Sequence, residues 1–247
     1  MKFRNLLVIS DNLYMCQHVA SILNEYPVHV RYAHSPGSPI GYLLSLTKSE
    51  DPINDCIDLK DANTVSLIVG QYDLVISLHC KQLFPNQLIN AVKCINLHPG
   101  FNPANRGWYP QVFAILHHTI LGATLHEISE ELDNGPIIAR EVVDLYEWDT
   151  SKTAYDRVVE KEIELFSKNI DSILKGEYKT VIDNSPGFLS LKKDYNKLLQ
   201  LDLSKQGTFK EFIDYLRALT HPPYQNAYFT ESNGEKIFVE LILKKAE

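Results

Sequence analysis

The sequence lacks the signatures of several common functional classes. No apolar run approaches the ~20 residues of a membrane-spanning helix, and residues 6–9 are too short an apolar run for a signal peptide and precede no cleavage site. The motifs G-x-G-x-x-G and G-x-x-x-x-G-K-[ST] are both missing, so neither a dinucleotide cofactor nor a P-loop is indicated. We therefore expect a cytoplasmic protein without membrane contacts.

Cysteine is scarce and scattered. The four cysteines, Cys16, Cys56, Cys80 and Cys94, form no C-x-x-C pair. This spacing favours reduced thiols over disulfides and argues against a zinc site. The paired histidines His117-His118 also lack a partner at metal-ligand spacing, so we expect no metal.

Positive charge is in short supply as well. The 247 residues hold 24 Lys and Arg against 31 Asp and Glu, a formal net charge of −7. Proteins that grip nucleic acid through its phosphates more often carry a basic face, so the charge argues against a nucleic-acid partner. Apolar residues make up 45% and charged residues 22% of the chain, as in ordinary globular proteins.

What is present is an alternation of short apolar runs and amphipathic segments through residue 176. The runs predict strands at 6–10, 28–33, 73–78, 94–97, 123–128 and 137–143, and the amphipathic segments predict helices at 13–24, 59–69, 86–92, 112–118 and 153–174. Strands and helices that alternate with short loops predict an α/β fold with a doubly wound, mostly parallel, Rossmann-like sheet. We therefore assign residues 1–176 to one domain.

The pattern changes in residues 177–247. Extended pieces at 180–186 and 188–191 and a helix at 209–219 precede a β-hairpin at 230–243 around Asn233-Gly234, a strong hairpin signal. This region is too small for a confident core of its own, so we expect an appendage that packs on the main domain, lends residues to a site or forms a subunit contact. Its apolar strand at 237–243 must bury one face, and its edge invites a partner strand, which predicts a homodimer.

The stretch 94–110 carries the clearest chemistry. It begins as a buried strand and breaks at Pro99-Gly100, which places Asn96 and His98 on one side of a strand at its C-terminal end. An amide that donates to an oxyanion beside an imidazole that takes a proton suits attack on a carbonyl. A carboxylate at Asp133, in a tight turn between two strands, would tune that imidazole. An incidental polar pair and a turn aspartate bound to its own backbone are the alternatives.

Two motifs together carry a family resemblance. Asn96-x-His98-Pro-Gly and Leu132-Asp-x-Gly-Pro-Ile137, in this order, resemble the N10-formyltetrahydrofolate-dependent formyltransferases. The resemblance implies direct formyl transfer to an amine through a tetrahedral intermediate, with Asn96, His98 and Asp133 as the catalytic triad and without a metal.

The resemblance also implies a site for the folate cosubstrate. It falls on two segments, residues 78–85 and 126–133, where an apolar slot edged by polar groups suits the flat pterin ring. The cofactor-binding residues it implies are Leu83, Phe84, His126, Ile128, Glu130 and Glu131.

Within the family, the chain is most similar to the sugar N-formyltransferase branch. Its tail, residues 217–229, resembles the segment which that branch uses near a nucleotide sugar, and this implies a dTDP-linked amino-dideoxy sugar, most closely dTDP-4-amino-4,6-dideoxyglucose. Tyr224 or Phe229 would stack the thymine, and Arg217 or Lys81 would meet the pyrophosphate. The substrate-binding residues that this branch implies are Asp11, Asn12, Lys81, Arg106, Trp108, Arg217, His221 and Tyr224.

Three alternatives stay open. A methionyl-tRNA formyltransferase would carry a further barrel domain and hold tRNA, and a glycinamide ribonucleotide formyltransferase would carry a glycine-rich loop where this chain has Ile9-Ser-Asp-Asn12. A non-catalytic module that senses folate or a nucleotide sugar would not need Asn96, His98 and Asp133 together. We give no chemical role to His79-Cys80, and we interpret the charged run 160–164 as a solvated helix face.

Overall fold

The structure is a computed structural model that describes residues 1–38 and 56–245. In these ranges six strands form the central sheet in the order β2-β1-β3-β4-β6-β7. Their bounds are β1 Asn5–Ser10, β2 His29–Ala33, β3 Leu74–Leu78, β4 Lys93–His98, β6 Leu121–Glu127 and β7 Ile137–Val143. β1 to β4 run parallel, whereas β6 pairs antiparallel with both β4 and β7. The predicted α/β fold with a mostly parallel sheet is confirmed.

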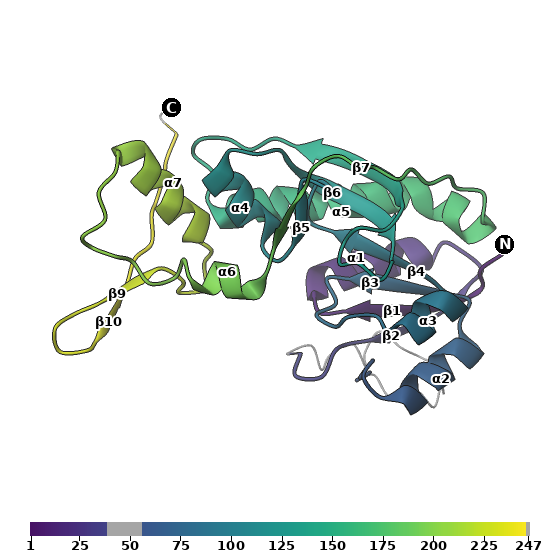
Figure 1. The fold of residues 1–247 in the computed structure, drawn as a ribbon. Coiled ribbons are helices and arrows are strands. Elements are labelled where there is room, and N and C mark those ends of the chain that lie inside the picture. The colour runs from purple at the N-terminus through teal and green to yellow at the C-terminus, as the bar shows by residue number, and fades with distance from the viewer. Residues whose placement is uncertain (39–55, 246–247) are drawn as a thin grey trace.

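Helices cover both faces of the sheet (Figure 1). α1 (Leu13–Leu23) and α5 (Ser151–Lys175) pack on one face, and α2 (Ala62–Gln71) and α3 (Asn86–Ala91) pack on the other. Alternate residues of each strand therefore fill two separate cores: Leu6 and Val8 face α1 and α5, whereas Leu7 and Ile9 face α2 and α3. Burial on both faces explains why the parallel strands read as continuous apolar runs.

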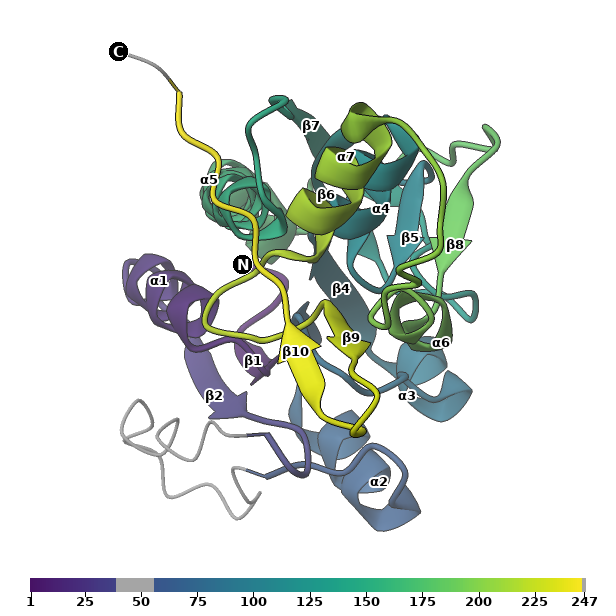
Figure 2. The ribbon, with the colours of Figure 1, turned by 90° about the vertical axis from the view of Figure 1, so that its left-hand side faces the viewer.

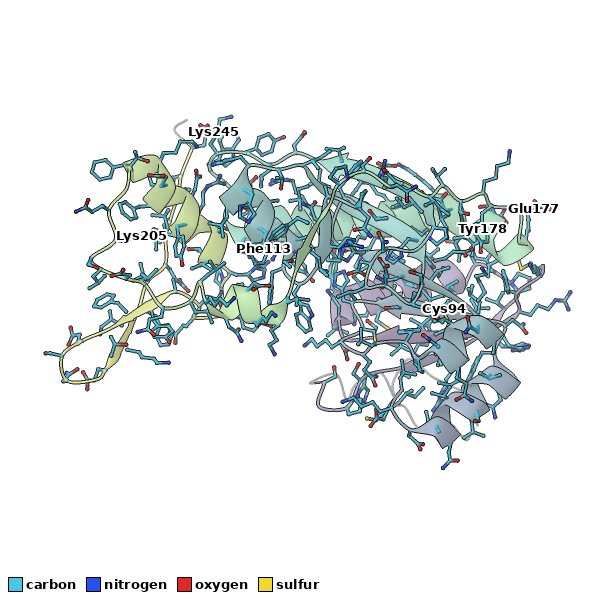
Figure 3. All side chains as sticks on the ribbon, viewed as in Figure 1. Cys94, Phe113, Glu177, Tyr178, Lys205 and Lys245 are labelled. Carbon is cyan, nitrogen blue, oxygen red and sulfur yellow. The ribbon has the colours of Figure 1, made fainter. Side chains whose placement is uncertain are left out.

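Most of the remaining elements lie at the end of the molecule opposite the N-terminus (Figure 1), which is the end that faces the viewer in Figure 2. They are α4 Pro110–His117, β8 Phe188–Ser190, α6 Lys192–Asn196, α7 Phe209–Leu219, β9 Tyr228–Thr230 and β10 Lys236–Phe238. A third apolar core joins Val112, Phe113 and Ile115 of α4 to Tyr195 and Leu219. Phe113, labelled in Figure 3, marks this junction between the first part of the chain and its C-terminal region. Because β1 starts near the N-terminus, this is also the side on which the parallel strands end.

A second link joins the two regions. β5 (Asn105–Gly107), in the loop after β4, pairs in parallel with β8, which lies more than 80 residues later in the chain. The loop that follows β4 is therefore held partly by the C-terminal region.

Most predicted element positions agree with the structure. The hairpin turns at Asn233-Gly234 with φ +88° at Gly234, as predicted. The strand expected over 237–243 is wrong in length, because β10 ends at Phe238. The helix expected from residue 59 begins at Ala62, where Asp61 caps it. β5 and α6 have no predicted counterpart, and the segment 42–46, for which the sequence gave no firm assignment, lies outside the described residues.

Within the described ranges, no helix has both the length and the apolar character needed to cross a bilayer.

Candidate active site

The C-terminal end of β4 brings together the three residues of the predicted catalytic centre. Asn96 and His98 alternate with buried Leu97 and so point to the same side of the sheet. Asp133 reaches them from the turn between β6 and β7, where its backbone adopts a left-handed conformation with φ +49°. The antiparallel register of β4 and β6 places His126 opposite Asn96.

Both ring nitrogens of His98 are engaged. Nε2 lies 2.6 Å from the carbonyl oxygen of Asn105, and since a carbonyl only accepts, Nε2 carries a hydrogen. Nδ1 lies 3.4 Å from Oδ2 of Asp133. The ring is only 3% exposed. The imidazole is therefore held rigidly between an acceptor on β5 and a carboxylate.

Asp133 is an ionised carboxylate in a nearly buried place. Its side chain is 10% exposed, and Oδ2 accepts a hydrogen bond of 3.0 Å from the Gly107 N–H. Burial raises the pKa of Asp133. The imidazoles of His98 and His126 and the Gly107 N–H together lower it by a larger amount, so the pKa lies well below its usual range. The turn is fixed from behind by Asn102, whose amide donates to the Asp133 carbonyl at 2.9 Å.

The amide of Asn96 lies between His126, Asp133 and Ser77. Nδ1 of His126 lies 2.8 Å from the Glu127 carbonyl and carries a hydrogen. One end of the Asn96 amide lies 3.2 Å from Nε2 of His126 and 3.3 Å from Oδ1 of Asp133, and the other end lies 2.7 Å from Oγ of Ser77. His126, predicted as a folate contact, thus lies among the three residues of the predicted catalytic centre.

A second polar cluster lies at the ends of β1 and β3. His79 follows β3, and its Nε2 lies 2.9 Å from the carboxylate of Glu162 on α5. Its Nδ1 lies 3.0 Å from the Tyr155 hydroxyl and 3.2 Å from the amide nitrogen of Asn12. The interpretation of residues 160–164 as a solvated face is wrong for Glu162, which is fully buried. The missed signal was its position four residues after Val158 and four before Phe166, on the apolar stripe of α5.

The C-terminal tail joins this second cluster. Nδ1 of His221 lies 3.0 Å from Oγ of Ser151, and its ring contacts those of Tyr155 and Tyr224 with centroids 5.5 and 5.9 Å away. Tyr224 itself is 66% exposed. Three predicted substrate-binding residues, Asn12, His221 and Tyr224, therefore lie along one chain of contacts through Tyr155, which the sequence analysis did not single out.

The predicted folate contacts other than His126 lie in the segments that follow β3 and β6. Phe84 and Ile128 pack against the core beneath α2 and α3, and the Ile128 N–H donates to the Cys94 carbonyl. Leu83 is a large apolar side chain left 76% exposed. The last two predicted contacts, Glu130 and Glu131, are exposed and accept hydrogen bonds from Asn86 and Asn134 respectively.

Four more predicted substrate residues have mixed placements. The carboxylate of Asp11 is occupied by the loops around it, since it accepts from the Ser35 N–H and hydroxyl and from the Lys81 N–H. The side chain of Lys81 is exposed. Arg106 faces Glu131 at 3.7 Å, and the Trp108 ring lies under the ammonium of Lys192, 5.5 Å from the ring centroid. Lys81 is therefore the one of these four whose charged end is open to a ligand within the described structure.

Arg217 does not lie where the sequence analysis expects it. Its side chain is 3% exposed and binds Asp214 at 2.7 Å and the carbonyls of Tyr146 and Asp149. A guanidinium buried and saturated in this way cannot meet a pyrophosphate without breaking the α7 contact. We correct the prediction: Arg217 anchors α7 to the loop before α5.

No group of three or more His, Cys, Asp and Glu side chains in residues 1–38 and 56–245 is arranged to hold a metal ion. The chemistry available is thus that of an amide donor, two imidazoles and one ionised carboxylate at the end of a parallel sheet. This arrangement suits the transfer of an acyl-type group to an external nucleophile, because it supplies a donor, a proton carrier and a charge that orients it.

Comparison with known proteins defines that class. Residues 6–170 match the family model described as formyl transferase, and residues 194–245 match the model described as the N-formyltransferase dimerization C-terminal domain. The chain therefore belongs to the formyl transferase family and is a formyltransferase, as the two sequence motifs predict.

Its similarities point to one branch of that family. A protein of Mycobacterium tuberculosis named dTDP-4-amino-4,6-dideoxyglucose formyltransferase is 48% identical over 207 residues, which are 84% of each chain. The crystal structure of a 4-N formyltransferase from Francisella tularensis superimposes with a TM-score of 0.90 at 41% identity, covering 98% of this chain and 99% of that one. A sugar N-formyltransferase from a Shewanella species gives 0.92 at 34% identity, with 99% of both chains covered.

Proposed function

We propose that this chain transfers the formyl group of N10-formyltetrahydrofolate to the amine of dTDP-4-amino-4,6-dideoxyglucose. The observation that carries the proposal is the convergence of Asn96, His98 and ionised Asp133 at one strand end. The similarity to a relative named for this substrate, at 48% identity, supports the choice of sugar. The four cysteines form no disulfide, which fits the cytoplasmic location that we also propose.

In this mechanism the sugar amine attacks the formyl carbon, a C–N bond forms, and the carbonyl oxygen gains a negative charge. Asn96 and the Nε2–H of His98 donate to that oxygen, which competes with the Asn105 carbonyl for the His98 hydrogen. The bond from the carbon to N10 then breaks, its electron pair goes to N10, and Nε2 of His98 gives its proton to N10. Nε2 then holds a lone pair and takes the proton that the amine nitrogen loses. Asp133 stays ionised throughout and stabilises the imidazolium form of His98.

The proposed donor site and the proposed acceptor site are formed by different segments of the chain. Leu83, exposed beside half-buried Phe84 and Ile128, offers an apolar wall that fits a pterin ring. The proposed nucleotide-sugar site includes Asn12, Lys81, His221 and Tyr224. The division that we propose, a catalytic domain in residues 1–176 and a C-terminal region in residues 177–247, then places the thymine end of the substrate on the C-terminal region.

The direct test measures release of tetrahydrofolate when the protein receives N10-formyltetrahydrofolate and a panel of dTDP-3-amino and dTDP-4-amino sugars. We expect turnover to be highest with the 4-amino-4,6-dideoxyglucose derivative. Turnover with methionyl-tRNA or glycinamide ribonucleotide instead would contradict the proposed substrate. Binding of the nucleotide sugar without any turnover would support the non-catalytic alternative.

Tyr224 is expected to stack the thymine. Tyr224→Ala should weaken the binding of dTDP and of thymidine alike by about 1–3 kcal/mol, the scale of one aromatic–base stack. Because the side chain is 66% exposed and contributes little to a core, the thermal midpoint should hardly change. Separate titrations of thymidine and of a folate analogue check this. Equal weakening of both ligands would show a general disturbance of the fold and defeat the stacking role.

We expect a homodimer held by the C-terminal region. Residues 194–245 match a dimerization domain, and β10 and the tail beyond it leave Ile237, Phe238 and Ile242 exposed, which a partner would cover. Sedimentation should give about twice the chain mass of 28.2 kDa. Phe238→Glu should shift the population toward monomer, whereas Leu67→Glu, at an equally exposed site on α2, should not. A monomeric wild type would refute the dimer.

A further inference from the structure

The side chains of the cluster of Asn12, His79, Tyr155 and Glu162 become more exposed from the interior to the surface. Glu162 is fully buried, and the side chain of His79 is 12% exposed. Asn12 and Tyr155 are partly exposed. A buried carboxylate is costly unless it is paired, so its persistence behind His79 indicates that the imidazole must be held in this place.

The backbone of His79 is bent to reach that place. A regular extension of β3 would point residue 79 to the same face as Ser77, toward α2 and α3. His79 instead adopts φ +54°, a left-handed conformation that is uncommon for a residue with a side chain. This turn sends the ring to the opposite face, onto α5. Strain of this kind persists only where the surroundings fix it, and it is common at ligand sites.

Glu162 fixes the tautomer of His79. Both carboxylate oxygens lie within 3.0 Å of Nε2, so Nε2 carries a hydrogen and donates it. In the neutral ring Nδ1 then holds a lone pair and faces outward as an acceptor. Glu162 therefore determines, through the His79 ring, that Nδ1 is a hydrogen-bond acceptor at the surface end of the cluster.

The outer end has more donors than acceptors. Asn12 and Tyr155 bring three hydrogens, because the Asn12 oxygen is occupied with the Met15 N–H. The contacts among the Asn12 nitrogen, the Tyr155 oxygen and Nδ1 of His79, at 3.0 to 3.2 Å, use only two of these hydrogens. Burial first, and then the charge of Glu162, raises the pKa of Tyr155 above its usual value, so the hydroxyl keeps its hydrogen. At least one donor is left for a ligand.

The position of this unused donor indicates which part of the nucleotide sugar it would contact. In the sheet β3 lies between β1, which precedes Asn12, and β4, which carries the catalytic centre. On its far side Tyr155 contacts His221, which contacts Tyr224. A nucleotide sugar with its amine at His98 and its base at Tyr224 would lay its middle, the diphosphate, over the cluster. The exposed ammonium of Lys81 lies on the same loop as His79.

We propose that Tyr155 donates its hydroxyl hydrogen to a diphosphate oxygen of the nucleotide sugar, and that His79, anchored by Glu162, is a positioning residue that acts through Asn12. Nδ1 of His79 accepts one hydrogen of the Asn12 amide, and the other hydrogen goes to the Tyr155 oxygen, which leaves the hydroxyl hydrogen for the ligand. The inference rests on the proposed function and adds to it the subsite and the residues for the diphosphate. Donors without acceptors suit phosphoryl oxygens, which only accept.

Tyr155→Phe tests the contact, because it removes the hydroxyl and keeps the ring against His221. Titrations with thymidine, dTMP and dTDP should show dTDP affinity lowered by about 10- to 100-fold, the range for one hydrogen bond to a charged group, with thymidine unchanged. In turnover, KM for the nucleotide sugar should rise while kcat falls much less. Tyr14→Phe is the matched control, since Tyr14 also joins α1 to α5 through a carboxylate, Glu160, away from the cluster.

A double-mutant cycle tests the positioning role. Asparagine tolerates left-handed backbone, so His79→Asn keeps the turn while shortening the side chain. It should lower dTDP affinity in the wild-type background and have little further effect in the Tyr155→Phe background. An equal loss in both backgrounds would show that His79 acts independently of Tyr155 and would overturn its positioning role.

The outcomes separate this inference from the proposed function. A wild-type protein that binds no dTDP would refute the nucleotide-sugar substrate itself. A wild type that binds dTDP, together with a Tyr155→Phe variant that binds it equally well, would overturn the diphosphate contact and leave the proposed function standing. Equal weakening of thymidine and dTDP in this variant would also overturn it, because the hydroxyl would then act on the base.

Discussion

Replacing His98 with asparagine is expected to lower kcat by about 10²–10⁴-fold, the usual range for a group that carries a proton in the transition state. Asparagine retains a donor of similar reach but cannot move a proton between the amine and N10. The substitution also removes the imidazolium of His98, whose Nδ1 lies 3.4 Å from Oδ2 of Asp133 and which that carboxylate would stabilise. The measurement is single-turnover formation of the formamide with saturating substrates, which separates chemistry from binding.

The control for this variant is His117→Asn. His117 is an exposed histidine at the end of α4 with no contact to Asn96 or Asp133, so its substitution should leave kcat unchanged. Near-native turnover in the His98 variant would refute the proton-carrying role and shift the catalytic weight to Asn96. Titration of dTDP into both variants should give wild-type affinity, because the nucleotide contacts that we propose lie outside β4.

The sequence was most informative where structure depends on local pattern. Apolar runs and amphipathic segments predicted the strands of the central sheet, because each parallel strand is buried on both faces and each helix has one apolar stripe. The spacing of Asn96 and His98 predicted a shared direction, since a strand alternates its faces. The structure adds that Asp133 reaches the same strand end, which the turn at residues 133–135 suggested without requiring it.

Contacts between distant segments could not be predicted in this way. β5 is three residues long and pairs with β8 across more than 80 residues, so neither strand has a periodicity of its own to detect. Arg217 shows the same limit: its charge suggested a ligand, but its partners are two backbone carbonyls and Asp214, visible only once α7 packs on the loop before α5.

The second polar cluster could not be predicted for another reason. Glu162 lies within a run of charged residues, and this local composition outweighed its place on the apolar stripe of α5. The backbone turn at His79 could not be predicted from the sequence either, because no glycine marks Leu78-His79-Cys80 as a position of positive φ. Local conflicts of this kind are expected at functional sites, where a fold carries strain for a reason other than stability.

Substitution of Gly107 is expected to give the second large loss of turnover, because the loop after β4 and the C-terminal region meet at its backbone. Its N–H donates to Asp133 at 3.0 Å, its φ is +86°, and a Cβ there would lie 2.0 Å from the Ser190 carbonyl oxygen of β8. Gly107→Ala should therefore separate β5 from β8 and displace the donor to Asp133. A shift of about 1 Å near a reacting centre can cost about 10²-fold in turnover, and we expect at least that loss in kcat.

Gly234→Ala provides a matched control for the backbone alone. Gly234 has φ +88° in the β9–β10 turn, but nothing lies within 4 Å of a Cβ built there. Both variants should carry the left-handed cost of about 1–2 kcal/mol, measured by denaturant unfolding, and only Gly107→Ala should lose more stability and turnover. If the two variants unfold alike and Gly107→Ala keeps wild-type kcat, then the contact with β8 does not hold Asp133 in place. The low pKa of that carboxyl would then depend on His98 and His126 without Gly107.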